Sequence, residues 1–154
     1  MTRVIKTDGY GHGALPVAKN GETMERVWGY AVATAQEAFH LRRNGIKKPI
    51  LILGYTFEGD YLKMVEEEIR PVVFRYETAA AFSRAAKEAG KTVHIHIGLD
   101  TGMHRIGFSD TMESIGEIQK IRQVEQVELE GFFTHFARAD GEDKTFARAQ
   151  LLPF

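Results

Sequence analysis

The sequence contains no cysteine, and this absence excludes both a disulfide framework and a thiolate metal site. It fits a protein of a reducing compartment, so we expect a cytoplasmic location. Long apolar runs are missing as well, since no stretch approaches the roughly 18 consecutive apolar residues of a membrane-spanning helix. The first residues, Met-Thr-Arg-Val-Ile-Lys, also lack the apolar core of a secretion signal.

An excess of one charge sign is absent too. The chain has 20 Lys and Arg residues against 21 Asp and Glu residues, a formal net charge of −1 at pH 7. Because both signs are scattered, there is no basic stripe of the kind that binds nucleic acid or acidic membranes. The 154 residues, 44% hydrophobic and 27% charged, are ordinary for one soluble globular domain. We therefore expect no nucleic-acid partner and no membrane partner.

The most informative stretch covers residues 4–13, Val-Ile-Lys-Thr-Asp-Gly-Tyr-Gly-His-Gly. β-Branched residues run directly into three glycines, so an extended segment is expected to end here in a tight loop that exposes backbone N–H groups. Such a loop can bind an anion, and Tyr10 and His12 add side-chain donors. Lys6 could form a Schiff base with an aldehyde cofactor whose phosphate is held nearby. A surface lysine before a glycine-rich turn is the alternative interpretation of this stretch.

Helical and extended patterns alternate along the rest of the chain. Helices are expected over residues 14–24, 34–44, 61–68, 79–88 and 112–124. Strands are expected over residues 27–33, 49–54, 69–74, 93–97 and 127–136. Thr34 and Glu37 form a capping box at the start of one helix, and Asn44-Gly45 ends it. A last helix is expected to open at Asp143 and to run towards Phe154.

Counting the first segment, six candidate strands separated by five helices predict a parallel sheet built from βα units. A whole (β/α)8 barrel takes about 250 residues. We therefore expect an α/β fold, namely an incomplete (β/α)8 TIM-type barrel with about six of its eight βα units. Such a barrel looks truncated and has unpaired strand edges. In such folds ligands bind at the carboxyl ends of the strands, where Lys6, residues 100–105 and His135 fall.

Three blocks of the sequence resemble the alanine racemases, in the order in which that family has them. They are residues 4–13, residues 99–108 (Leu-Asp-Thr-Gly-Met-His-Arg-Ile-Gly-Phe) and residues 131–140 (Gly-Phe-Phe-Thr-His-Phe-Ala-Arg-Ala-Asp). Residues 29–33 and 49–54 also resemble the family's second and third barrel strands. The resemblance implies that residues 1–154 are part of the N-terminal TIM-barrel domain of a fold type III, pyridoxal-phosphate-dependent racemase. The C-terminal β domain of that family would be absent.

The resemblance also implies roles for individual residues. Lys6 would bind pyridoxal 5'-phosphate and act as a catalytic base, Tyr10 would contact the phosphate, Arg105 the phenolic oxygen, and His135 would lie near the cofactor ring. The implied reaction interconverts L- and D-alanine by removal of the Cα proton, supplying D-alanine for peptidoglycan. In the family the second base is a tyrosine from the C-terminal region of a partner subunit. We therefore expect a homodimer in the full-length protein, and little activity from this chain alone.

One position departs from the family pattern. Many members have a carbamylated lysine seven residues before the arginine of the second block, where this chain has Gly98. Either another anion substitutes for that carbamate, or Arg105 is held differently. His94 and His96 share a strand face with Gly98. We interpret both as polar barrel fillers rather than metal ligands, with His96 leaning into the space that Gly98 leaves.

Three alternatives stay open. A racemase for serine or another small amino acid fits the same blocks, because the pocket residues that determine the size of the accepted substrate lie partly outside this chain. A non-catalytic barrel that binds pyridoxal phosphate, like the small cofactor-homeostasis proteins, fits the short length, although the Asp-Thr-Gly-Met-His-Arg block favours the racemase. The third is an inert fragment that neither closes nor binds the cofactor.

Overall fold

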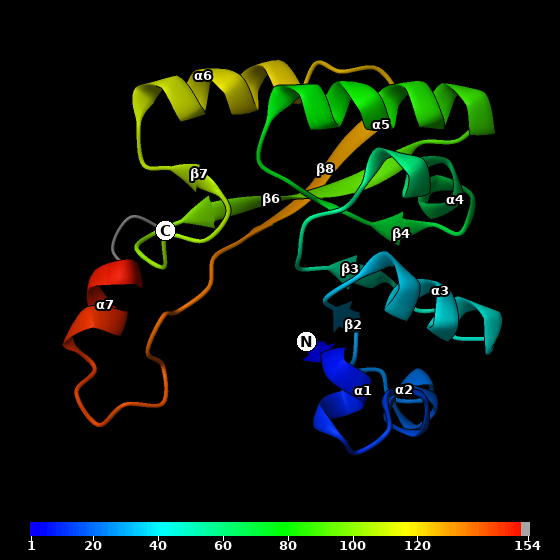
Figure 1. Cartoon of the computed structure of the whole chain (residues 1–154), viewed down its shortest axis with the longest axis horizontal. Coiled ribbons are helices and arrows are strands. Elements are labelled where there is room, and N and C mark those ends of the chain that lie inside the picture. The colour runs from blue at the N-terminus through cyan, green and yellow to red at the C-terminus, as the bar shows by residue number, and fades with distance from the viewer. Residues whose placement is uncertain (152–154) are drawn as a thin grey trace.

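The computed structural model describes residues 1–151. Its strands are β1 (Thr2–Val4), β2 (Gly29–Val32), β3 (Ile50–Ile52), β4 (Ile69–Arg70), β5 (Val72–Val73), β6 (Val93–Asp100), β7 (Phe108–Ser109) and β8 (Val127–Phe133). Its helices are α1 (Lys6–Tyr10), α2 (Ala14–Glu22), α3 (Ala35–Arg43), the short 3-10 helix η1 (Glu58–Asp60), α4 (Tyr61–Glu66), α5 (Tyr76–Ala89), α6 (Met112–Ile121) and α7 (Thr145–Leu151). Figure 1 shows how they alternate along the chain.

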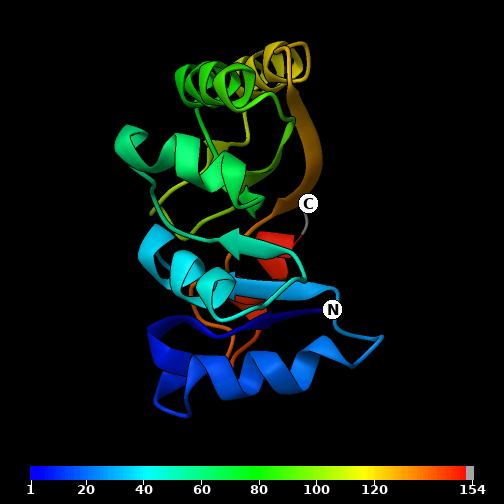
Figure 2. The ribbon, with the colours of Figure 1, turned by 90° about the vertical axis from the view of Figure 1, so that its right-hand side faces the viewer.

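All strand pairs among the described residues are parallel. β1, β2, β3 and β4 are neighbours in chain order, and β6 pairs with β5, β7 and β8. Figure 2 shows helices α2 to α6 in an arc around the strands. This arrangement is part of a (β/α)8 barrel and confirms the expected fold class.

Pro71 divides the strand expected over residues 69–74 into two. Proline has no N–H to donate to a neighbouring strand, and the chain changes partner at this residue. β4 pairs with β3, whereas β5 pairs with β6. The Pro71 carbonyl still accepts a hydrogen bond from the His96 N–H at 3.0 Å, so the two parts of the sheet remain joined.

The ends of the other elements differ from the expected ends by a few residues. The capping box at α3 is confirmed, because Thr34 accepts a hydrogen bond from the Glu37 N–H and the Glu37 side chain accepts one from the Thr34 N–H. α5 begins at Tyr76 rather than at residue 79. β6 extends to Asp100 and β8 stops at Phe133. Of the helix expected over residues 143–154, the structure has α7, and residues 152–154 lie outside the described part.

The two faces of β6 meet different surroundings. Val93, Ile95 and Ile97 are at most 2% exposed and belong to the hydrophobic core that also holds Phe82 of α5 and Ile121 of α6. The opposite face carries His94, His96 and Gly98, and it looks into the barrel. Within residues 1–151, no helix has the length and apolar character needed to cross a membrane.

Candidate active site

Lys6 lies at the carboxyl end of β1, directly before a turn with an unusual backbone. Thr7, Asp8, Gly9 and Tyr10 all have positive φ, between 50° and 63°. The chain therefore makes a left-handed helical turn after Lys6, where the sequence predicted a tight loop that exposes backbone N–H groups. Such a conformation is costly for residues with a Cβ, so the surrounding structure has to hold it.

Two carboxylates hold this turn. Glu37 of α3 accepts a hydrogen bond from the Thr7 N–H at 2.6 Å. Asp8 accepts one from the N–H of Ala14, the first residue of α2, at 2.8 Å. The position of Lys6 is therefore set by both neighbouring helices. Glu37 was identifiable from the sequence as a capping residue only, since nothing in the pattern links it to a residue 30 positions earlier.

Tyr10 stands beside Lys6 at the open end of the barrel. The Lys6 Nζ atom lies 5.9 Å from the centroid of the Tyr10 ring. Tyr10 is 59% exposed and Lys6 is half-buried. Both side chains are consequently within reach of a ligand that enters from this end.

The second and third blocks meet at the carboxyl ends of β6 and β8. Arg105 and His135 line the same small cavity as Gly98. The hydroxyl groups of Thr101 and Thr134 join the two segments through a hydrogen bond of 2.8 Å. Segments far apart in the sequence are thus fastened together at the end of the barrel where Lys6 lies.

The site is electrostatically positive. Partial burial lowers the pKa of His135, and the positive charges of Arg105 and Lys6 lower it further. Among the described residues, neither Lys6 nor Arg105 takes part in a salt bridge. The structure therefore brings the four residues selected from the sequence to one end of the barrel, where their charges favour an anionic ligand.

Asp100 organises the loop that carries Arg105. Its Oδ1 atom accepts hydrogen bonds from the N–H groups of Gly102 and His104, at 3.0 and 2.9 Å. Burial alone would raise the pKa of Asp100, but the N–H donors of His104 and Gly102 outweigh burial and hold the pKa below its ordinary value. Asp100 therefore supports the backbone of this loop.

Gln150 of α7 is a part of the site that the sequence did not indicate. It is 1% exposed, accepts a hydrogen bond from the Ala137 N–H at 3.0 Å and donates one to the His135 carbonyl at 3.1 Å. Its Cγ atom also lies 3.4 Å from where a Cβ of Gly102 would be. A glutamine in a short helix looks like a surface residue until the fold brings its partners together.

The space beside Gly98 is filled by apolar side chains. A Cβ at Gly98 would lie 3.0 Å from Val72 Cγ2 and 3.9 Å from Phe133 Cζ. The interpretation that His96 leans into this space is wrong. The His96 ring lies against Gly131 instead, with two ring atoms 2.9 Å from where a Cβ of Gly131 would be.

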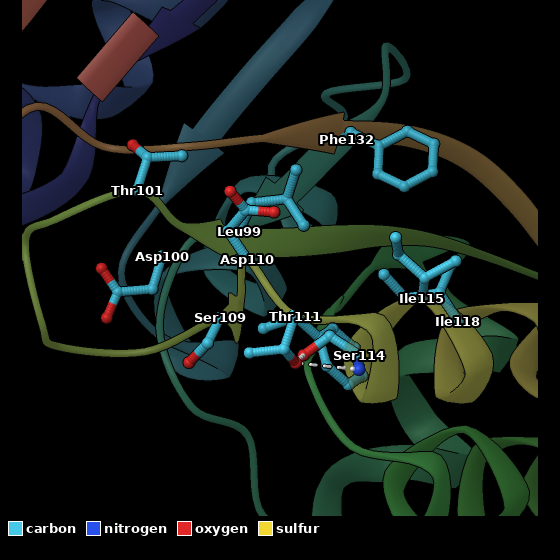
Figure 3. Close-up of a pocket in the computed structure, with 11 residues that line it drawn as sticks. Leu99, Asp100, Thr101, Ser109, Asp110, Thr111, Ser114, Ile115, Ile118 and Phe132 are labelled. Atoms are coloured by element: carbon cyan, nitrogen blue, oxygen red, sulfur yellow. Dashed lines mark hydrogen bonds between the residues drawn. The ribbon is translucent and has the colours of Figure 1, made fainter. Parts of the chain in front are cut away.

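A separate cavity of about 210 Å³ opens on the outer face of the sheet. In Figure 3 it lies between β6 and α6, with Phe132 on one side and Ile115 and Ile118 on the other. Its lining is mostly apolar and includes neither Lys6 nor Arg105. We assign no chemistry to this cavity.

Comparisons with known proteins match nearly the whole chain to racemases. The alanine racemase of Methanococcus maripaludis is 44% identical over 155 residues, which are 98% of this chain and 40% of that protein. The structure of the alanine racemase of Clostridium difficile 630 matches with a TM-score of 0.95 at 42% identity, covering 99% of this chain and 40% of the other. A histidine racemase of Leuconostoc mesenteroides matches with a TM-score of 0.86 at 26% identity, covering 99% of this chain and 41% of the other.

The chain thus spans about two fifths of the length of the curated relatives that it matches. The family model for the N-terminal domain of alanine racemase matches residues 1–154. The chain therefore belongs to the alanine racemase family and corresponds to an N-terminal portion of it.

Proposed function

We propose that this chain binds pyridoxal 5'-phosphate through Lys6 and supplies one half of the active site of an alanine racemase. The observation that carries the proposal is the gathering of Lys6, Arg105 and His135 at one end of the barrel, with the pKa of His135 lowered there. A phosphate-bearing aldehyde suits this site, because it offers a carbonyl to an amine and negative charge to the neighbouring cations.

Each residue has a role that its chemistry supports. The Lys6 amine would hold the cofactor through its aldehyde group, and as a free amine it would take the Cα proton from one face of the substrate. Tyr10 would donate to the phosphate, and Arg105 would donate to the phenolic oxygen because a guanidinium keeps its charge and presents fixed donors. His135 would contact the ring. The cofactor, when bound, supplies the electron sink that makes removal of this proton feasible.

The activity of the whole protein is part of the proposal. Racemisation needs a second base on the opposite face of the substrate, and we propose that a partner subunit of a homodimer supplies it. Residues 1–154 would then be a partial N-terminal barrel domain, with the remaining βα units and the C-terminal β domain outside this chain. We further propose a bacterial-type role in the cytoplasm, in which D-alanine is made for peptidoglycan.

A second candidate concerns the substrate. The match to a histidine racemase indicates that this portion of the fold is shared by racemases with different substrates. A racemase for serine or another amino acid therefore remains compatible with the site. A longer protein that includes this chain should be assayed with L-alanine, L-serine and L-histidine, and turnover confined to L-alanine is the expected result.

The cofactor proposal is tested by covalent labelling. Pyridoxal phosphate is added to the purified chain, borohydride reduces the bond between aldehyde and amine, and peptide mass spectrometry locates the modified lysine. We expect stoichiometric labelling of Lys6 and none in a Lys6→Arg variant, whereas Lys19→Arg, a change at an exposed lysine of α2, leaves the labelling unchanged. Labelling spread over many lysines, or no labelling, would contradict the proposal.

A further inference from the structure

β6 and β8 do not pair in a single register. Ile95 pairs with Leu129, but the next residue, His96, pairs with Gly131. Glu130 is therefore an additional residue on β8, with no counterpart on β6. This is a β-bulge, which is rare between parallel strands and tends to occur where a side chain has to be re-aimed.

The bulge exchanges the two faces of β8. Alternate residues of a strand point to opposite faces, so one additional residue turns every later side chain to the other face. Phe133 pairs with Gly98 and lines the inner cavity together with Arg105 and His135. Phe132 lines the outer cavity beside α6, as Figure 3 shows. In a regular register Phe132 would pair with Gly98 and Phe133 would turn outward, which would also redirect the short segment that leads from Phe133 to His135.

The carboxylate of Glu130 reaches back into the barrel. It accepts hydrogen bonds from Arg70 Nε at 3.2 Å and Arg70 Nη2 at 3.4 Å, and His96 Nε2 lies 3.0 Å from its Oε2 atom. The Trp28 ring centroid is 5.9 Å from that of His96. Burial raises the pKa of Glu130, but the bonds from Arg70 and His96 outweigh it and hold the pKa below its ordinary value.

These contacts are partly shielded from water. The side chains of Arg70, His96 and Glu130 are 15%, 12% and 24% exposed. Charge-assisted hydrogen bonds are stronger in such surroundings than at an open surface. Gly131 is part of the arrangement, since a Cβ there would lie 2.9 Å from two atoms of the His96 ring and would displace it.

We infer that the Glu130 bulge, clamped by Arg70 and His96, is the positioning device that turns His135 into the mouth of the barrel beside Arg105 and Lys6. Glu130, Arg70 and His96 touch no ligand in this scheme and are positioning residues. The inference rests on the proposed function for what binds at the mouth. The orientation of His135 itself is independent of it.

The test compares two glutamates on the same strand. Glu128 also contacts a histidine of β6, His94 at 3.3 Å, but its side chain is 63% exposed and it lies outside the bulge. In Glu130→Ala, we expect NMR titration of the labelled imidazoles to show the pKa of His135 rising towards the ordinary value of about 6.5, because the ring leaves its positive surroundings. The pyridoxal phosphate concentration that half-labels Lys6 should rise several-fold. Glu128→Ala should change neither value.

Two further variants keep the inference testable if the Glu130→Ala protein does not fold. Arg70→Met combined with Glu130→Ala removes both charges of the clamp, so no charge is left unpaired in the barrel. Glu130→Gln keeps the side-chain length and one acceptor oxygen. We expect the double variant to raise the pKa of His135 as fully as Glu130→Ala does, and Glu130→Gln to raise it less. Far-UV circular dichroism establishes which variants are folded.

An unchanged His135 pKa in a folded Glu130→Ala or double variant would overturn the inference. The same holds if Glu128→Ala shifts His135 equally, because the effect would then belong to any lost contact between β6 and β8. If Lys6 of the unaltered chain is not labelled, the proposed function fails for this chain. The His135 titration still decides the inference in that case.

Discussion

Two helical glycines lie in opposite environments. A Cβ at Gly21 of α2 would lie 2.6 Å from the hydroxyl oxygen of Tyr30. Tyr30 is fully buried, and its hydroxyl donates to the Ala18 carbonyl at 2.6 Å. By contrast, a Cβ at Gly116 of α6 would meet no atom within 4 Å. The same substitution should therefore have opposite effects at these two positions.

Gly21→Ala is expected to lower the free energy of unfolding by about 1–3 kcal/mol, because the helix has to move away from Tyr30. Gly116→Ala is expected to raise it by about 0.5–1 kcal/mol, because alanine restricts the unfolded chain and favours the helix. Urea unfolding followed by circular dichroism measures both. A destabilised Gly116→Ala protein would show that an open Cβ position is not the deciding factor in α6.

The carboxylate of Asp100 contributes to the free energy of unfolding in a pH-dependent way. Its pKa in the folded chain lies below the ordinary value, so it stabilises the fold at every pH above its unfolded pKa of about 3.9. This contribution is lost as the pH falls through the lower, folded pKa. In Asp100→Asn we expect the free energy of unfolding to fall by about 1–2 kcal/mol at pH 7, since the N–H donors then face a neutral acceptor.

The measurement for Asp100 is a series of urea titrations from pH 7 to pH 3 on the unaltered chain and on Asp100→Asn. The difference between the two proteins should be constant down to about pH 5 and should shrink below about pH 4. A difference at pH 3 as large as the difference at pH 7 would assign the effect to the shape of the side chain rather than to its charge.

The residues that we propose to carry chemistry are more predictable from the sequence than those that support them. Lys6, Tyr10, Arg105 and His135 stand in dense local motifs, where glycines and polar groups follow one another within a few positions. Gln150 has partners 13 and 15 positions away. Such supporting contacts depend on which elements pack together, and no local pattern encodes them.

Among the elements, α3 is joined to two loops by the side chain of Arg42. Arg42 donates hydrogen bonds to the carbonyl groups of Ile46 and Lys48, and also to those of Glu67 and Glu68 before β4. Burial lowers the pKa of Arg42, and the nearby Arg70 lowers it further. One guanidinium thus satisfies four backbone acceptors in two loops.

Arg42→Ala is expected to lower the free energy of unfolding by about 2–4 kcal/mol, because several of these carbonyls lose their donor. Arg42→Lys should recover only part of this, since an ammonium group cannot reach all four acceptors from one position. Urea unfolding measures both variants. Full stability of Arg42→Lys would mean that the charge, and not the fork of donors, holds the two loops.

The helices and strands can be predicted from the apolar periodicity of the sequence, whereas their interruptions cannot. The capping box of α3 is a local pattern and was predictable. The change of partner at Pro71, the left-handed turn after Lys6 and the bulge at Glu130 depend on contacts with other elements. A bulge in particular adds a residue without altering the apolar run in which it lies.

On the scale of the whole molecule, β8 presents an open surface. Among the described residues it pairs only with β6, so its other edge has free backbone donors and acceptors. The neighbouring outer face exposes large apolar side chains, with Met112 80%, Ile115 46% and Phe132 48% exposed. Free strand edges and contiguous apolar surface both promote association between chains.

We expect the 154-residue chain to self-associate through this surface in a concentration-dependent way, as judged by size-exclusion chromatography with light scattering. Ile115→Lys combined with Phe132→Thr should shift the chain towards the monomer, because it replaces the apolar centre of the surface with polar groups. Phe57→Thr is the matched control, since Phe57 is 69% exposed but precedes η1. A monomer at all concentrations, or an equal response to Phe57→Thr, would show that the outer face of β8 and α6 is not the contact surface.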